Sequence, residues 1–311
     1  MSDGDTGRVA VFGSLNLDLT VSVERFPRPG ETLTGSELVT APGGKSANQA
    51  AAAAVLGSAV RLVGAVGDDP NGEVLLERAG AAGVDVSGVR RDPEHATGSA
   101  MIVVDADGEN TIIVSPGANG NLSPGSVPPD LCEGAAVLCL VLEVPVAAVQ
   151  AAAEQARAAG VQVLLNLSPV RHVPDELLAL TDVLLVNRDE AAAVLGLPEL
   201  DDDWERHLAG LQECGVARTV VTLGAQGSVV LDATAAGDAR VRPIEAVPVE
   251  AIDTTGCGDA FTGALAHALA GGATLVDAAR LAAAASALAS TRPGAQSSYA
   301  AFAHLRGRDQ A

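Results

Sequence analysis

The residues of this chain best placed to do chemistry lie in the heptapeptide DTTGCGD at 253–259, which leads straight into an alanine-rich apolar segment. Two glycines let neighbouring backbone N–H groups turn toward one point, and a helix that begins here adds the positive end of its dipole. Such a loop is suited to binding phosphate. Asp259 stands at the helix start, where a carboxylate caps the helix or, if it points into a cleft, accepts a proton. A plain turn with Asp259 as the helix cap is the alternative interpretation.

A second cluster, PGGKSAN at 42–48, contains the only lysine of the chain, Lys45. It is not a P-loop, because that motif needs a glycine at the position of Val39. Adjacent glycines, the second of them Gly44, let the backbone approach a small polar ligand, while Lys45 and Asn48 supply donors. We therefore interpret the cluster as a ligand site, the alternative being a helix start with a solvated lysine.

Three polar side chains stand at the ends of apolar strands. Asn16 and Asp18 follow the strand expected at 8–13, and their alternation with leucine places both on one face. Glu143 follows the strand expected at 136–142, where it either accepts hydrogen bonds from hydroxyl groups or lies in solvent. Ligands of α/β folds bind at the carboxyl ends of strands, so Glu143 is a candidate ligand contact.

Asn187 and Glu190 open a helix after another apolar strand. Asn as the N-cap with Glu three residues later forms a capping box, which is a purely structural explanation. Alternatively, the amide and the carboxylate hold a hydrated metal ion that carries phosphates. Farther along, Thr222, Gly224 and Gly227 occupy a strand-to-turn segment suited to backbone contact with a nucleotide.

These residues require a scaffold in which strands and helices alternate. Apolar strands are expected at 8–13, 60–66, 136–142, 161–167, 183–186 and 219–223. Helices are expected at 46–56, 73–82, 146–159, 188–195 and 204–214, and two alanine-rich helices follow the 253–259 motif. This alternation predicts an α/β fold with a central, mostly parallel sheet flanked by helices on both faces.

Two early regions do not fit the alternation. Strand-like residues at 19–24 and 31–40 flank a turn with two prolines, and 99–104 and 110–114 form a predicted hairpin. We interpret both regions as a separate small β-sheet, a lid over the carboxyl edge of the main sheet. The main α/β domain would then comprise residues 1–17, 41–96 and 116–311, and the lid would comprise residues 18–40 and 97–115.

The composition excludes several classes of protein. A formal net charge of −20 disfavours nucleic acid and anionic membranes as partners, because both require a basic face. The apolar runs are too short to cross a bilayer and residues 1–8 do not resemble a signal peptide, so we expect a cytoplasmic protein with reduced thiols. The histidines show no metal-ligand spacing, and none is assigned a role.

Two signatures make the chain similar to the ribokinase-like family of carbohydrate kinases. The early signature lies at 43–50 and the late one at 253–259, in the order found in the family. Further matches lie at 13–18, 29–32, 108–110, 117–119 and 294–296, so the resemblance covers nearly the whole chain.

The resemblance implies roles for the matching positions. Asp259 would be the base that takes the proton from the acceptor hydroxyl, and the N–H groups of Gly256, Cys257 and Gly258 would form an anion hole. The sugar would be held by Asn16, Asp18, Gly44, Lys45, Asn48, Glu143 and Asp259. Asn187 and Glu190 would position magnesium-bound phosphates, with Thr222, Gly224, Gly227 and Gly258 along the nucleotide. A monovalent cation, usually potassium, would be bound by Asp253, Thr255, Ala289, Arg292, Gly294 and Ser298.

The implied activity is ATP-dependent transfer of the γ-phosphoryl group to the 5-hydroxyl of D-ribose, giving ribose 5-phosphate, in a homodimer joined through the lid. Alternatives are a related kinase for deoxyribose, fructose or a nucleoside, and a catalytically silent sugar-binding protein. The chain departs from the family at Ser46, where glycine is common, and at Cys257, where alanine is common. Because Cys257 would lie at a helix N-terminus, we expect the pKa of its thiol to be lowered.

Overall fold

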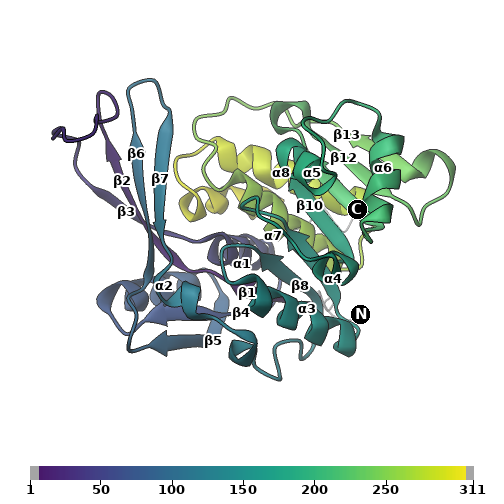
Figure 1. Ribbon diagram of the computed structural model, residues 1–311, viewed down its shortest axis with the longest axis horizontal. Coiled ribbons are helices and arrows are strands. Elements are labelled where there is room, and N and C mark those ends of the chain that lie inside the picture. Colours follow the sequence, from purple (N-terminus) through teal and green to yellow (C-terminus); the bar gives the residue numbers. More distant parts are fainter. Residues whose placement is uncertain (1–6, 306–311) are drawn as a thin grey trace.

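The computed structural model describes residues 7–305, which form two β-sheets and the helices that pack on them (Figure 1). The larger sheet has nine strands in the order β13-β12-β11-β10-β9-β8-β1-β4-β5. Its members are β1 (Arg8–Gly13), β4 (Val60–Gly67), β5 (Val84–Asp92), β8 (Ala135–Val141), β9 (Gln162–Asn166), β10 (Val183–Asn187), β11 (Arg218–Thr222), β12 (Ser228–Asp232) and β13 (Val241–Ile244). Neighbouring strands run parallel except at β11–β12 and β12–β13. The mostly parallel sheet predicted from the sequence is confirmed.

Helices cover both faces of this sheet, as predicted. One face carries α1 (Lys45–Leu56), α2 (Pro70–Ala81), α7 (Cys257–Ala270) and α8 (Leu275–Ser290), and the other carries α3 (Val146–Ala159), α4 (Asp175–Ala179), α5 (Arg188–Val194) and α6 (Trp204–Glu213). Successive residues of a strand point to opposite faces. In β1, Val9 and Val11 therefore join the first core, while Ala10 and Phe12 join the second. None of the helices in residues 7–305 is both long and apolar enough to cross a membrane.

Small residues let α1 and α7 pack with their backbones close together. A β-carbon added to Gly263 of α7 would lie 2.5 Å from the carbonyl oxygen of Gln49 and 2.6 Å from the β-carbon of Ala52, both on α1. A larger residue would force the two helices apart, because protein interiors are closely packed. This approach brings together the first turns of both helices, which carry Lys45 and Asp259.

Ser46, in the first turn of α1, is fully buried, and its hydroxyl has no hydrogen-bond partner among the described residues. The hydroxyl lies against Gly13, since a β-carbon added there would be 2.1 Å from Ser46 Oγ. A buried hydroxyl without a partner costs about 1–3 kcal/mol, so we expect Ser46→Ala to raise the free energy of unfolding by about 1 kcal/mol. Urea denaturation measures this, and Ser290→Ala, which removes a bonded hydroxyl, is the destabilising control. A Ser46→Ala protein less stable than wild type would contradict the prediction.

The smaller sheet has four strands in the order β3-β2-β6-β7. They are β2 (Asn16–Ser22), β3 (Val39–Gly43), β6 (Gly98–Val104) and β7 (Asn110–Ser115), and they project from one side of the main body (Figure 1). The predicted hairpin is confirmed, because β6 and β7 pair antiparallel. Several large apolar side chains of this sheet are exposed, among them Val39, Met101 and Ile113.

Some strand predictions are wrong or incomplete. Residues 31–38 form no strand, although one is expected at 31–40; only Val39–Gly43 pairs with a neighbour. Residues 31–38 are mostly exposed, and strand propensity alone does not make a strand without a partner. The sequence did not predict β5, β12 and β13. The small sheet also reaches past the expected lid limits, since β2 begins at Asn16 and β3 ends at Gly43.

Candidate active site

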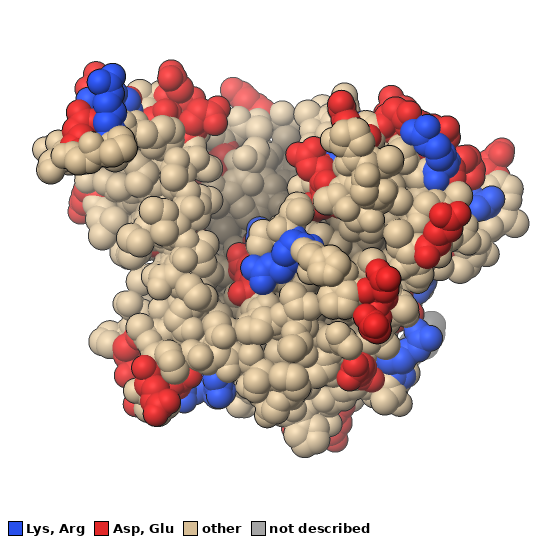
Figure 2. Space-filling model, in the orientation of Figure 1, with Lys and Arg blue, Asp and Glu red and all other residues tan. Residues whose placement is uncertain are grey.

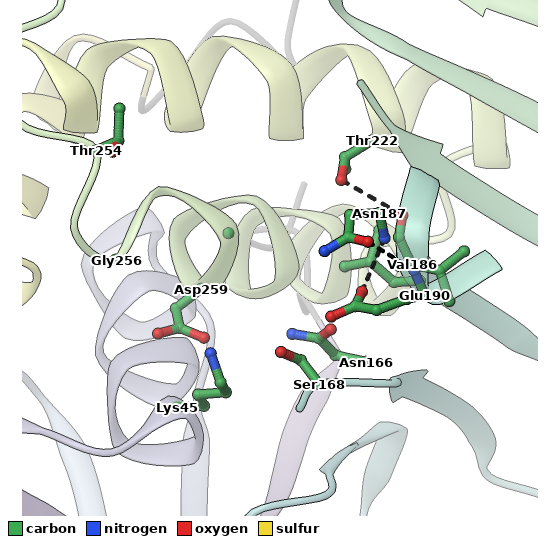
Figure 3. Close-up of a pocket in the computed structure, with 12 residues that line it drawn as sticks. Lys45, Asn166, Ser168, Val186, Asn187, Glu190, Thr222, Thr254, Gly256 and Asp259 are labelled. Atoms are coloured by element: carbon green, nitrogen blue, oxygen red, sulfur yellow. Dashed lines mark hydrogen bonds between the residues drawn. The ribbon is translucent and has the colours of Figure 1, made fainter. Parts of the chain in front are cut away.

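The molecule is hollowed between the small sheet and the main body (Figure 2). A cavity of about 280 Å³ is lined by Lys45, Ser168, Asn187, Glu190, Thr222 and Asp259, among others (Figure 3). A second cavity of about 600 Å³ adjoins it and shares Thr222, Thr254 and Gly258 with it. Residues from several of the clusters predicted from the sequence therefore line one continuous site.

Asp259 lies in the first turn of α7 and is only 6% exposed. Its carboxylate accepts a hydrogen bond from Asn48 Nδ2 at 2.9 Å and one from Gln49 Nε2 at 3.1 Å. Burial raises the pKa of Asp259, opposed by the nearby charge of Lys45 and by both amide donors. A carboxylate held in this way is a suitable general base, because a raised pKa brings it closer to the operating pH. Gln49 lies within the early signature at 43–50, but the sequence analysis gave this residue no role.

Lys45 is the first residue of α1, and its side chain lies beside Asp259 (Figure 3). Burial disfavours its charge, but the carboxylates of Asp259, Glu143, Glu190 and Asp18 outweigh this effect and raise the pKa of the ammonium group. A single cation therefore faces four carboxylates. The alternative of a solvated lysine is wrong.

Glu143 lies just beyond the carboxyl end of β8 and accepts two hydrogen bonds. One comes from the hydroxyl of Ser14 at 2.6 Å and one from the backbone N–H of Lys45 at 2.9 Å, so the alternative of a free strand-end residue is wrong. The carboxylate of Asp18 lies against Gly43, where an added β-carbon would be 2.2 Å from Asp18 Oδ2. Any side chain at position 43 would displace this carboxylate, so glycine keeps it in place.

Asn16 and Gly44 meet where the small sheet joins the main body. Gly44 has φ 86°, and an added β-carbon would lie 2.7 Å from the backbone nitrogen of Asn16. The buried Asn16 side chain accepts a hydrogen bond from Asn119 Nδ2 at 2.9 Å. Asn119 also bonds to the backbone N–H and carbonyl of Leu15, at 3.1 and 2.9 Å. Sequence reasoning matched the motif that contains Asn119 but gave this residue no role.

The residues predicted to hold a sugar are thus brought together. Direct contacts or close charges connect Asn16, Asp18, Gly44, Lys45, Asn48, Glu143 and Asp259. Their individual roles toward a ligand stay predictions.

Asp18 gives the protein a predicted pH dependence. Burial, with the neighbouring carboxylates of Glu143 and Asp259, raises its pKa from 3.8 to about 7, against the attraction of Lys45. The folded protein therefore holds this proton more tightly than the unfolded chain, and the resulting stability is lost as the pH rises through about 7. We expect the stability advantage of Asp18→Asn over wild type to grow by up to about 2–3 kcal/mol between about pH 5 and about pH 8. Urea midpoints across this range measure it; a constant difference between the proteins would contradict the prediction.

The loop before α7 ends at Gly256, which has φ 73°. A β-carbon there would lie 2.5 Å from the β-carbon of Ala295, so only glycine fits. The hydroxyl of the buried Tyr299 donates to the Gly256 carbonyl at 3.0 Å and holds the loop from behind. The N–H of Cys257 donates to the Thr254 carbonyl at 3.2 Å, so a phosphate would compete for it. Tyr299 is a further residue that sequence reasoning missed.

The expected lowering of the Cys257 pKa is wrong. Burial, with the carboxylates of Asp253 and Asp259 adding to it, raises the pKa of this thiol to about 11. The sequence argument considered only the helix N-terminus; it left out the two aspartates of the same heptapeptide and the burial of the thiol, which only the fold shows. Because the thiolate is the reactive form, Cys257 is a poor nucleophile at neutral pH.

Asn187 and Glu190 form the predicted capping box. The Glu190 N–H donates to Asn187 Oδ1 and the Asn187 N–H donates to Glu190 Oε2, both at 2.8 Å (Figure 3). Both residues also line the cavity, so the capping box does not exclude a role in the site. Burial raises the pKa of Glu190, opposed by the Asn187 N–H, the Ser168 hydroxyl and Lys45. A carboxylate and an amide in a cavity fit a hydrated magnesium ion that carries phosphates.

Thr222, Gly224 and Gly227 line the larger cavity, as a nucleotide-binding segment would. Most other lining residues are apolar, including Val247, Pro248, Val249, Phe261, Ala283 and Ala287. A flat, largely apolar ring system fits such a cavity. Phosphates attached to it would extend past the residues that line both cavities and toward Asp259.

Asp253, one of the residues predicted to bind a monovalent cation, connects two loops through hydrogen bonds. Asp253 accepts hydrogen bonds from the N–H of Thr255 at 2.8 Å and the N–H of Gly294 at 2.7 Å. Of the other predicted residues, Ala289 lies in the last turn of α8, Arg292 in the loop after it, and Ser298 in η5 (Gln296–His304). Residues 7–305 contain no cluster of three or more His, Cys, Asp or Glu side chains able to hold a metal. A carboxylate nevertheless supplies the oxygen ligands that a hard cation prefers.

The chain matches the family described as pfkB family carbohydrate kinase over residues 6–301. A ribokinase of Haemophilus influenzae is 37% identical over 293 residues, which cover 93% of this chain and 94% of the relative. A ribokinase of Schizosaccharomyces pombe is 35% identical over 314 residues, which cover 96% of each chain.

Solved structures show the same similarity. The structure of Arabidopsis thaliana ribokinase complexed with ribose and ATP has a TM-score of 0.89 and 31% identity, covering 96% of this chain and 98% of that one. The ribokinase from Thermotoga maritima has a TM-score of 0.85 and 31% identity, covering 96% and 99%. The similarity spans nearly the whole chain, so it includes both sheets.

Proposed function

The chain belongs to the pfkB family of carbohydrate kinases, and on that premise we propose that it transfers the γ-phosphoryl group of ATP to the 5-hydroxyl of D-ribose, giving ribose 5-phosphate. The similar ribokinases, one of them complexed with ribose and ATP, support this choice of substrates. The observation that carries the proposal is the buried Asp259, which two amides hold beside Lys45 in the smaller cavity.

In this reaction Asp259 acts as the general base. As the 5-oxygen attacks the γ-phosphorus, its proton passes to a carboxylate oxygen of Asp259, and the bond from phosphorus to the ADP oxygen breaks. Lys45 and the N–H groups of Gly256 and Gly258 stabilise the negative charge on the transferring group. The catalysis rests on positioning and charge, since no covalent bond to the protein forms.

Two ions complete the proposed site. Magnesium, bound with the nucleotide, would neutralise charge on its phosphates, and Asn187 and Glu190 would hold it through water. A monovalent cation such as potassium would be held by Asp253, Thr255, Ala289, Arg292, Gly294 and Ser298. Because Ala295 packs against Gly256, this second site would stabilise the loop that binds phosphate.

We further propose that the small sheet acts as a lid over the sugar and as the interface of a homodimer. Its exposed apolar residues, which include Val39, Met101, Ile112, Ile113 and Val114, support this role, because such patches mark contact surfaces. Sedimentation at micromolar concentration tests it, and a monomer would exclude the dimer. The cytoplasmic location expected from the sequence stays a prediction.

A coupled ADP-release assay tests the function. The protein would be given ATP, magnesium and one of ribose, deoxyribose, fructose or adenosine, each with potassium or with sodium only. The highest turnover is expected on ribose with potassium. Higher turnover on another acceptor would favour a related kinase, and binding of ribose without any turnover would favour a silent sugar-binding protein.

A further inference from the structure

Gln296, at the start of η5, is joined to the proposed base through one intermediate residue. Its Nε2 donates to Asn48 Oδ1 at 3.0 Å, and Asn48 Nδ2 donates to Asp259 Oδ2 at 2.9 Å. The three residues come from η5, α1 and α7, and 248 positions separate Gln296 from Asn48 in the sequence. The half-buried Gln296 immediately follows Ala295, which packs against Gly256.

The ionised carboxylate fixes the direction of every bond in this row. A carboxylate only accepts hydrogen bonds, so Asn48 must turn its NH₂ group toward Asp259. The carbonyl oxygen of the same amide then faces Gln296, which must present its own NH₂ group. A donor at position 296 is therefore the arrangement that agrees with a charged Asp259.

We propose that Gln296 is a positioning residue that holds the Asn48 amide in the orientation in which it donates to Asp259. The effect of Gln296 on catalysis rests on the proposed function, because Asp259 is the base in that reaction. Both the nitrogen and the oxygen of the Asn48 amide form hydrogen bonds. The other donor, Gln49, has a buried Oε1 without a partner among the described residues. The loop after α8 thus reaches the base through Asn48.

Other charged or titratable groups also face Asp259 and must be kept constant in a test. They are Lys45 on α1, Asp18 on β2, Glu143 after β8, Cys257 on α7 and Tyr299 on η5. None of them contacts Gln296 through a hydrogen bond in the structure. Substitution of Gln296 therefore changes the hydrogen bond to Asn48 without removing any of these groups.

The decisive variant is Gln296→Glu. The introduced carboxylate accepts but does not donate, so the Asn48 amide turns to donate to it and presents its oxygen to Asp259. Loss of a donor and addition of an acceptor both favour the protonated form of Asp259. We expect the pKa of Asp259 to rise by about one unit, so the acid limb of the pH dependence of kcat moves to higher pH by the same amount.

Two matched variants separate the effect of the lost hydrogen bond to Asn48 from the effect of an added charge. Ser297→Glu adds the same charge at the next, exposed position, and Gln296→Met removes the donor with no added charge. We expect the pKa of Asp259 to move by less than about 0.3 units in Ser297→Glu, and by an intermediate amount in Gln296→Met.

Carboxyl ¹³C NMR titration of aspartate-labelled protein, with Asp259→Asn used for assignment, measures this pKa without any need for turnover. An unchanged Asp259 pKa in Gln296→Glu, or an equal shift in Ser297→Glu, would overturn the proposal. A shifted pKa with an unchanged pH dependence of kcat would support the positioning role and instead contradict Asp259 as the base. The experiment therefore distinguishes failure of the positioning proposal from failure of the proposed function.

Discussion

Asp259→Asn is expected to lower kcat on ribose by about 10²–10⁴-fold, the usual contribution of a general base. The substitution keeps the size of the side chain but removes its ability to take the hydroxyl proton. Lys45, the amide N–H groups and the remaining sugar contacts stay in place, so ribose affinity should change little. Because both Asn48 and Gln49 donate to this carboxylate, the introduced amide loses one of two hydrogen bonds, and a moderate fall in stability accompanies the loss of turnover.

The control for this experiment is Asp277→Asn. Asp277 occupies the same position in the first turn of α8 that Asp259 occupies in α7, but it is exposed and lies outside both cavities. Its substitution should leave kcat unchanged. Steady-state ADP release and ribose binding by calorimetry are measured for both variants. Near-normal turnover in Asp259→Asn would refute the assignment of the base.

Lys45→Met is expected to impair binding, turnover and stability together. The lysine faces the carboxylates of Asp18, Glu143, Glu190 and Asp259, and no other lysine exists in the chain to replace it. Removal of one partner from a buried ionic cluster typically costs about 3–5 kcal/mol, because the remaining charges lose their compensation. The variant should lose about that much stability near pH 8, with kcat at least about 10²-fold lower.

The pH dependence of this loss identifies its cause. Without the cation the pKa values of Asp18, Glu190 and Asp259 rise further, so the folded state holds protons more tightly and stability falls more steeply as pH increases. Lys45→Arg, which keeps the charge, should retain most of the stability. Urea midpoints at several pH values provide the measurement. A pH-independent loss in Lys45→Met would indicate lost packing and not lost charge.

Much of the fold follows from local patterns in the sequence. Continuous apolar runs identified β1, β4, β8 and β11, and glycine after an alanine-rich segment identified the end of α1. Of the missed strands, β5 has a weak pattern, because it is a partly exposed edge strand that contains Gly88 and two arginines. Such a strand is defined by pairing with β4, which local sequence does not reveal.

The candidate site was predictable where a role depends on a short motif. The loop at 253–259, the lysine cluster and the capping box at Asn187 all lie where expected. The positions of Asn119, Gln49 and Gln296 depend on contacts between segments separated by 103 to 248 residues. Amide side chains are common and carry no characteristic spacing, so only the folded structure shows what they hold.

The surplus of carboxylates around Lys45 has a kinetic consequence. ATP and its magnesium complex are both anionic, and they approach a cleft with net negative charge on a chain of net charge −20. Long-range repulsion slows such encounters, and salt screens it, with a Debye length of about 8 Å at physiological ionic strength. The association rate of the nucleotide should therefore increase with ionic strength, most strongly for free ATP. The protein would capture its phosphoryl donor fastest in a salt-rich medium.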